Sequence, residues 1–256
     1  MIYVKRIRIP ALPTEAPRRL YVYLPKGYHR SDLRYPVVYM FDGHNVFYDS
    51  HATYGKSWGM KEYLEKTGRE LILVAVECNP EGNRRLNEYT PWMFRCPLGT
   101  FEAQGKETMD WFTEVLKPEI DRTYRTLTDR EHTMIAGSSM GGLMSIYAAV
   151  AYNAVFSKAA ALSPSLWVSR TNMKEMIKSH AIAQPTRIYM DLGSAEIDGH
   201  REALGWMFDT AKRLSEKGAD VSASVIPDAL HNEAAWEKRI PVFFDYLLDD
   251  ETGGKR

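Results

Sequence analysis

The chain has 256 residues, with 33 basic and 33 acidic side chains and a formal net charge of zero. This length suits one sizeable α/β domain, and we expect a single domain over residues 1–256. The balanced charge, with no basic stripe interleaved with aromatic residues, argues against nucleic acid as a partner. Because the only cysteines are Cys78 and Cys96, a disulfide framework is excluded, and we predict neither a metal nor a cofactor.

The apolar stretches of the chain are short. The longest of them, such as residues 71–76, have the length of a strand and fall far short of the ~20 residues that span a bilayer. Residues 1–9 alternate apolar and basic side chains, which is typical of an edge strand rather than of a signal peptide. We therefore expect a cytoplasmic protein that has no membrane partner, while its oligomeric state stays unknown.

The predicted elements begin with strands and then alternate with helices. Strands are expected at 1–9, 20–24, 35–41, 71–77, 132–136, 158–162, 186–192 and 221–226, and helices at 58–66, 108–116, 143–150, 172–179, 201–217 and 233–248. Antiparallel entry strands followed by repeated strand–helix units indicate an α/β fold. We predict a mostly parallel, doubly wound sheet flanked by helices.

Residues 78–105 interrupt this alternation, because they show neither a helical nor a strand period and are rich in aromatic side chains. Loops of this length are usually functional or disordered, and the aromatic content argues against disorder. We predict an ordered, lid-like insertion. The alternative is a loop that packs its aromatic side chains on the sheet edge for stability alone.

A glycine-rich turn at residues 137–142 reads Gly-Ser-Ser-Met-Gly-Gly and lies between a predicted strand and a predicted helix. This is the context of a G-x-S-x-G nucleophile elbow with Ser139 at its apex. Gly137 and Gly141 would let the strand and the helix pass close to each other. The same letters also fit a Gly/Ser loop that caps a helix through Ser138 or Ser139. The flanking elements favour the elbow and a serine hydrolase.

A serine nucleophile needs a histidine base that is itself oriented by a carboxylate, and on this fold they follow in the order serine, acid, histidine. His231 comes just after the last predicted strand and is the expected base. The acid should lie in the loop that follows Leu192. Spacing does not decide between Glu196 and Asp198, whereas Asp191 falls within the strand.

The oxyanion of an acyl-transfer reaction needs two backbone N–H donors. One is expected from Met140, the residue after the nucleophile. For the other, the turn at residues 41–47 follows the third predicted strand, and Gly43 permits close backbone approach, so we predict the N–H of His44. Without an elbow, the same turn would be an ordinary one with His44 facing solvent.

Six segments together resemble the putative esterase family, which includes enterochelin-type siderophore esterases, feruloyl and acetyl-xylan esterases, and mycolyltransferases. These segments are 42–47, 88–92, 137–142, 163–167, 193–196 and 231–236. The resemblance implies an α/β-hydrolase fold with Ser139 as nucleophile and His231 as base. It also favours Glu196 as the acid, because the family's carboxylate ends a Gly-Thr-x-Glu/Asp segment. His44 departs from the glutamine that is common in the family.

These observations predict a carboxylic ester hydrolase that works through an acyl-enzyme on Ser139. An acyltransferase with the same residues is the near alternative, and a non-catalytic binding module would be expected to lack Ser139 or His231. Aromatic side chains expected around the site favour a flat acyl group or a sugar ring. Together with the resemblance, this implies a small-molecule or oligosaccharide ester of feruloyl, carbohydrate or siderophore type. The residues expected to contact it are Arg85, Glu88, Tyr89, Trp92 and Trp167.

Overall fold

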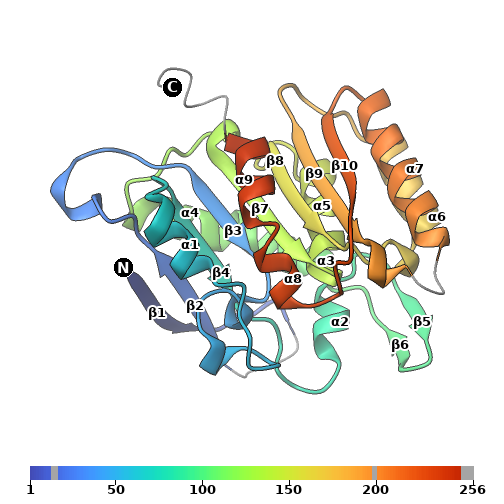
Figure 1. Cartoon of the computed structure of the whole chain (residues 1–256), viewed down its shortest axis with the longest axis horizontal. Helices are drawn as coiled ribbons and strands as arrows, with labels where there is room; N and C mark the ends of the chain where they lie inside the picture. Colours follow the sequence, from blue (N-terminus) through green and yellow to red (C-terminus); the bar gives the residue numbers. More distant parts are fainter. Residues whose placement is uncertain (13–16, 198–200, 249–256) are drawn as a thin grey trace.

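A computed structural model describes residues 1–12, 17–197 and 201–248. Within these residues, eight strands form one sheet in the order β1-β2-β4-β3-β7-β8-β9-β10 (Figure 1). They are β1 Ile2–Ile7, β2 Arg18–Tyr23, β3 Val37–Met40, β4 Ile72–Val76, β7 Thr133–Ser138, β8 Lys158–Leu162, β9 Arg187–Gly193 and β10 Asp220–Ile226. The β1–β2 and β2–β4 pairs are antiparallel and the others are parallel, which confirms the predicted α/β fold.

Helices cover both faces of the sheet. On one face, α1 (Met60–Thr67) and α9 (Ile240–Leu248) bury apolar side chains against the strands (Figure 1). The other face is covered by α3 Gly105–Trp111, α4 Lys117–Thr123, α5 Met140–Ala151, α6 Arg170–Ser179 and α7 Glu202–Glu216. The central strands are buried on both faces, as their continuous apolar sequences require. No helix among the described residues is both long and apolar enough to cross a bilayer.

The last predicted helix, 233–248, is divided into α8 (Glu233–Glu237) and α9. Asn232 caps α8 by accepting a hydrogen bond from the Ala235 N–H at 3.0 Å. Pro241 lies in the first turn of α9, where its missing N–H costs nothing but where it would interrupt a longer helix. Arg239 lies in this break, outside both helices, and its side chain is buried.

The segment predicted as an insertion, 78–105, contains elements that its sequence did not indicate. They are α2 (Arg84–Glu88) and a hairpin of β5 (Phe94–Cys96) and β6 (Gly99–Phe101), which lies at the lower edge of the view in Figure 1. Phe94 stacks on Phe101 with ring centroids 5.1 Å apart and meets the Trp167 ring at 5.6 Å. The hairpin is therefore tied to the loop that follows β8.

Parallel strands place their carboxyl ends along one edge of the sheet, where ligands bind in open α/β folds. The segments that leave this edge carry every residue predicted for the chemistry among those the structure describes. They are the turn Gly43–Asn45 after β3, Ser139 after β7, residues 163–168 after β8, the turn Ser194–Glu196 after β9 and His231 after β10.

Candidate active site

Ser139 lies at the apex of the tight connection between β7 and α5. Its backbone has φ 58° and ψ −120°, a strained conformation that a non-glycine residue adopts only when its surroundings require it. A Cβ at Gly137 would lie 2.7 Å from the carbonyl carbon of Gly141, so only glycine allows the strand and helix to come this close. The Ser139 hydroxyl is partly exposed and lies 3.3 Å from Ser165 Oγ.

His231 and Glu196 form the second part of the site. His231 Nδ1 lies 2.7 Å from Glu196 Oε2, and the imidazole is half exposed whereas the carboxylate is buried. Burial opposes ionisation of Glu196, but hydrogen bonds from His231 and Ser163 outweigh it, so the Glu196 pKa lies below its ordinary value. The ring of Trp236 packs edge-on against His231 at 5.1 Å. Asp198, the alternative acid, lies outside the described residues.

The turn after β3 brings a second set of backbone amides to the sheet edge. Gly43 is required there, because a Cβ would lie 2.7 Å from the backbone carbonyl of Ala75. His44 is the middle residue of this short 3₁₀ turn, and Met140 is the first residue of α5. The N–H groups of a helix's first turn have no partner within the helix, so both positions are suited to bind an anion.

An ion pair between a half-buried arginine and a buried aspartate supports this turn. Both carboxylate oxygens of Asp42 accept hydrogen bonds from Arg85, at 2.6 and 2.7 Å. The Tyr89 hydroxyl accepts a hydrogen bond from the Asp42 N–H at 3.1 Å. Burial opposes ionisation of Asp42, but the charge and hydrogen bonds of Arg85 prevail and hold the pKa of that carboxyl below its usual value. The insertion therefore contributes directly to the shape of the turn.

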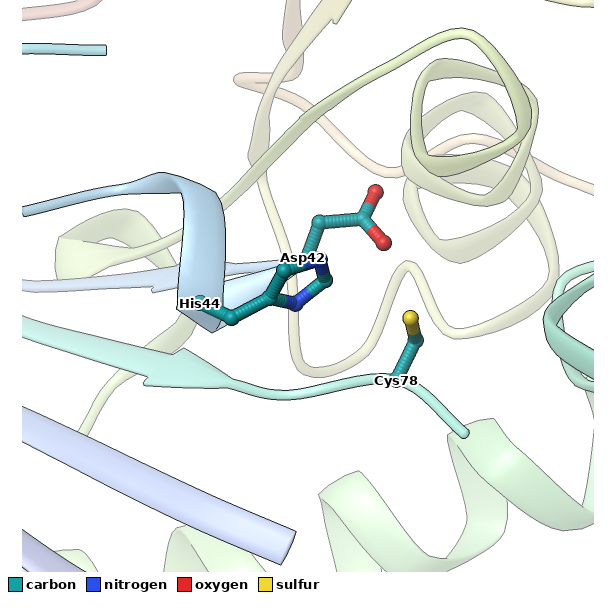
Figure 2. Close-up of side chains that lie close together, drawn as sticks. All are labelled: Asp42, His44 and Cys78. Carbon is teal, nitrogen blue, oxygen red and sulfur yellow. The ribbon is translucent and has the colours of Figure 1, made fainter. Parts of the chain in front are cut away.

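Asp42, His44 and Cys78 gather beneath the turn (Figure 2), with their ligand-type atoms within 4.8 Å of one another. Burial lowers the pKa of His44, whose Nε2 lies 2.9 Å from Thr53 Oγ1, and raises that of the Cys78 thiol. The spacing would suit a transition metal. Arg85, however, already places a positive charge on both oxygens of Asp42, so a cation there would meet like charge, and we assign the cluster to support of the turn.

Two cavities meet at His231. A polar cavity of about 700 Å³ is lined by Ser139 and His231 together with His44, Asn45, Arg85 and Glu233 among others. A more apolar cavity of about 470 Å³ is lined by Pro164, Trp167, Leu192, Ile197, Trp206 and His231 among others. A substrate with its reacting carbonyl near Ser139 could therefore place a polar part and an apolar part in different compartments.

Of the five residues predicted to contact substrate, the structure brings two to these cavities. Arg85 lines the polar cavity while pairing with Asp42, and Trp167 lines the apolar one with 48% of its surface exposed. Trp92 instead packs against Tyr147 on α5, with ring centroids 5.9 Å apart, and is not among the residues that line either cavity.

Glu88 and Tyr89 correct the sequence prediction most clearly. Both are almost completely buried. Glu88 forms an ion pair with buried Arg18 and accepts a hydrogen bond from the Asn79 N–H at 3.0 Å, so its carboxylate is committed to the interior. The Tyr89 hydroxyl accepts its hydrogen bond from the turn after β3. These two side chains hold the insertion and the turn in place rather than facing a ligand.

Three residues near the site were not among those predicted to act there. Trp206 on α7 lines the apolar cavity together with Trp167. Asn45 donates a hydrogen bond from Nδ2 to Glu233 Oε1 at 3.0 Å, which links the turn after β3 to the segment that carries His231. Arg239 is 2% exposed and reaches Glu196. An arginine within the apolar stripe of a predicted helix could have indicated a buried role.

The model of the family described as "Putative esterase" matches residues 13–247. A relative from Bacillus subtilis (strain 168), "Uncharacterized protein YbbA", is 28% identical over 209 residues, which cover 78% of this chain and 79% of the relative. Among solved structures, an IroE-like serine hydrolase from Shewanella oneidensis superposes with a TM-score of 0.76 at 20% identity, covering 96% of this chain and 79% of that one. The enterobactin esterase FES from Shigella flexneri superposes with a TM-score of 0.74 at 16% identity, covering 98% and 59%.

Proposed function

The chain belongs to the esterase family matched above, and we propose that it is a serine carboxylic ester hydrolase in which Ser139 is the nucleophile, His231 the base and Glu196 the acid. One observation carries this proposal. The strained Ser139 and the imidazole of His231 line one cavity, and the other side of that imidazole is held by a buried carboxylate at 2.7 Å.

The reaction follows from these positions. His231 takes the Ser139 proton as Oγ bonds to the ester carbonyl carbon, and the carbonyl becomes an oxyanion. His231 then gives that proton to the departing alkoxide, which leaves the acyl group on Ser139. A water molecule, deprotonated by His231, attacks the acyl-enzyme and releases the acid and free Ser139. Glu196 stabilises the imidazolium that forms in each half-reaction.

The oxyanion requires fixed donors, and the backbone N–H groups of Met140 and His44 are proposed to supply them. Each belongs to the first turn of a helix, where the helix leaves its N–H groups without partners. The support beneath His44 from Asp42 and Arg85 keeps the turn in one conformation, so little reorganisation is needed when charge develops.

Trapping the acyl-enzyme tests the proposal directly. The protein is mixed with a nitrophenyl ester, quenched within one turnover, and the acylated peptide is identified by mass spectrometry. We expect acylation at Ser139, and a loss of about 10⁴-fold in kcat for Ser139→Ala. Ser145→Ala removes a hydroxyl nearly two turns further along α5 and is the matched control. Near-normal turnover in folded Ser139→Ala would overturn the mechanism.

The acyl-enzyme can pass its acyl group to water or to another alcohol, and the first outcome is the one proposed here. The same experiment distinguishes them when a small alcohol such as glycerol is added. Release of the free acid as the main product supports a hydrolase. A yield of new ester that exceeds the acid at low alcohol concentration would instead identify an acyltransferase with the same catalytic residues.

The apolar cavity supports an aromatic group on one side of the scissile ester. Trp167 and Trp206 provide two indole rings in its wall, and the Arg170 guanidinium lies 4.6 Å from the Trp206 ring centroid and fixes that ring from outside. Aromatic contacts add ~0.5–1.5 kcal/mol beyond area burial, which corresponds to roughly 2- to 13-fold in kcat/KM. We therefore propose feruloyl-type or catecholate esters as better substrates than long-chain acyl esters.

Replacing each tryptophan in turn tests this preference. We expect Trp206→Ala and Trp167→Ala to reduce the ratio of kcat/KM for feruloyl to octanoyl esters by about tenfold. Trp92→Ala is the matched control, because that ring packs on Tyr147 away from the apolar cavity. A kcat/KM that rises steadily with acyl chain length and that neither cavity variant alters would reject the aromatic assignment.

A further inference from the structure

A buried charged cluster lies behind the Glu196 carboxylate, on the side away from His231. Its centre is Arg239, whose side chain is 2% exposed and which lies between α8 and α9. Arg239 Nη1 lies 2.7 Å from Asp191 Oδ1, and Nη2 lies 3.2 Å from Glu196 Oε1. Asp191, on β9, is fully buried and also accepts a hydrogen bond from the Tyr189 hydroxyl at 2.8 Å. One cation thus serves two carboxylates.

Ser163 connects this cluster to Glu196 through a hydrogen bond whose donor and acceptor are fixed. Its Oγ accepts hydrogen bonds from Trp236 Nε1 and Arg239 Nη1, both at 3.0 Å, and neither nitrogen can act as an acceptor. The Ser163 hydroxyl must therefore donate its proton to Glu196 Oε1, which lies 2.7 Å away. Oε1 also accepts from the Gly193 N–H at 2.8 Å, so that Oε2 is the oxygen left for His231.

The net charge of this cluster determines how strongly it attracts a protonated His231. Arg239 with Glu196 alone would be neutral, and the carboxylate would have little net attraction to offer an imidazolium. With Asp191 present, the three groups carry one net negative charge, and His231 neutralises it when it takes the serine proton. We propose that Asp191 and Arg239 are positioning residues for the proposed catalytic triad of Ser139, His231 and Glu196. Asp191 neutralises the positive charge of Arg239, so that the negative charge of Glu196 remains available to stabilise the His231 imidazolium.

This inference rests on the proposed function, since it concerns the proton that His231 moves. Other charges near the imidazole must be held constant in a test. Glu233 on α8 is a second carboxylate close enough to interact with His231, and the Asp42–Arg85 pair, which is neutral as a unit, also lines the polar cavity. The variants below leave all three of these groups unchanged.

The test measures the titration of the His231 imidazole by NMR in protein carrying Ser139→Ala, which requires no turnover. Asp191→Asn removes a negative charge of almost unchanged shape, and we expect the midpoint of the His231 titration to fall by about 0.5 pH or more. Arg239→Gln removes the positive charge, and we expect the midpoint to rise. The double variant restores one net negative charge, so its midpoint should return towards that of the parent.

Arg18→Gln is the matched control, because Arg18 is as buried as Arg239 and pairs with Glu88 rather than with the triad. It should lower the free energy of unfolding and leave the His231 midpoint in place. If Arg239→Gln does not fold, Arg239→Lys can replace it as a variant that keeps the positive charge. The His231 midpoint measured in Asp191→Asn is then sufficient to decide the proposal. An unchanged or raised midpoint in Asp191→Asn overturns the proposal whether or not the protein hydrolyses esters. Because the titrations need no turnover, they can be interpreted even if the esterase assays fail.

Discussion

The turn after β3 (the proposed oxyanion turn) and the end of β9 with its following turn (the proposed acid loop) both carry residues of the candidate site. Each is held by an arginine that pairs with an aspartate. At the oxyanion turn, Arg85 pairs with Asp42, and the pKa of that carboxyl lies below its usual value. Behind the acid loop, Arg239 is shared by Asp191 and Glu196. There burial raises the pKa of Asp191, although Arg239 and Tyr189 act against it.

The difference shows how one type of ion pair can serve two purposes. In the proposed mechanism, the oxyanion turn presents a backbone N–H, and the neutral Asp42–Arg85 pair holds its shape without adding a field that would repel the developing anion. In the same mechanism, the acid loop stabilises a cation on His231, and the extra carboxylate of Asp191 leaves one negative charge available. The number of carboxylates on each arginine, rather than the presence of the pair, distinguishes the two loops.

The strongest way to break this comparison is to remove the charge from one carboxylate on each side. Glu196→Gln should lower kcat by roughly 10³–10⁴-fold, because a neutral amide neither orients His231 correctly nor stabilises its imidazolium. Asp42→Asn should cost about tenfold at most, since it only loosens the turn. Asp198→Asn is a further control for the acid. If Asp198→Asn or Asp42→Asn proves as harmful as Glu196→Gln, the assignment of roles is wrong.

The role of the oxyanion turn is tested at His44. His44→Pro removes the backbone N–H and should lower kcat by on the order of 10²–10³-fold, while His44→Ala keeps the donor and should cost far less. Circular dichroism and the melting temperature check that both variants fold. A severe loss in His44→Ala would show that the imidazole itself contacts substrate and that the turn does more than present its backbone.

The stability of the turn should depend on the pairing of Arg85. Arg85→Gln leaves the carboxylate of Asp42 buried without its counter-charge, and we expect the free energy of unfolding to fall by about 1–3 kcal/mol, given that the arginine side chain is 26% exposed. Adding Asp42→Asn to this variant should recover part of the loss, since the unpaired charge is then absent. Urea unfolding of the three variants measures the coupling, and losses that simply add would contradict the neutral-pair interpretation.

Local sequence was sufficient for the features that lie within one segment. The elbow around Ser139 and the order of strands and helices follow from a glycine-rich turn between a strand and a helix and from apolar periodicity, and the family match supports the same reading. The single helix predicted at 233–248 was wrong because an apolar stripe continues through the break, and only Pro241 marks it.

Contacts between distant segments could not be predicted in this way. Glu88 and Tyr89 look the same in the sequence whether they face solvent or the interior, and their partners Arg18 and Asp42 lie 70 and 47 residues away. Arg239 likewise meets Asp191 across 48 residues. A side chain's direction out of an irregular loop is set by such partners, so the substrate-contact predictions in the insertion had no local basis for their orientation.

The smallest expected effect is on the pH dependence of stability, and it has opposite signs for the aspartates that pair with Arg85 and Arg239. The Asp42 pKa is depressed in the folded protein, so this group contributes stability that is present above its unfolded value of about 3.9 and is lost as the pH falls through the folded value. The Asp191 pKa is raised, so its contribution is fully present below about 3.9 and is lost as the pH rises through the folded value.

Urea unfolding of the parent, Asp42→Asn and Asp191→Asn between pH 3 and 8 should therefore give opposite trends. The stability advantage of the parent over Asp42→Asn should grow as the pH rises towards and just above 4, and then stay level. Its advantage over Asp191→Asn should shrink as the pH rises above 4, because the parent then holds a carboxylate that shares its arginine. Equal slopes for the two variants would mean that Arg239 satisfies both of its carboxylates fully, and the distinction between the two loops would then lie in shape rather than in charge.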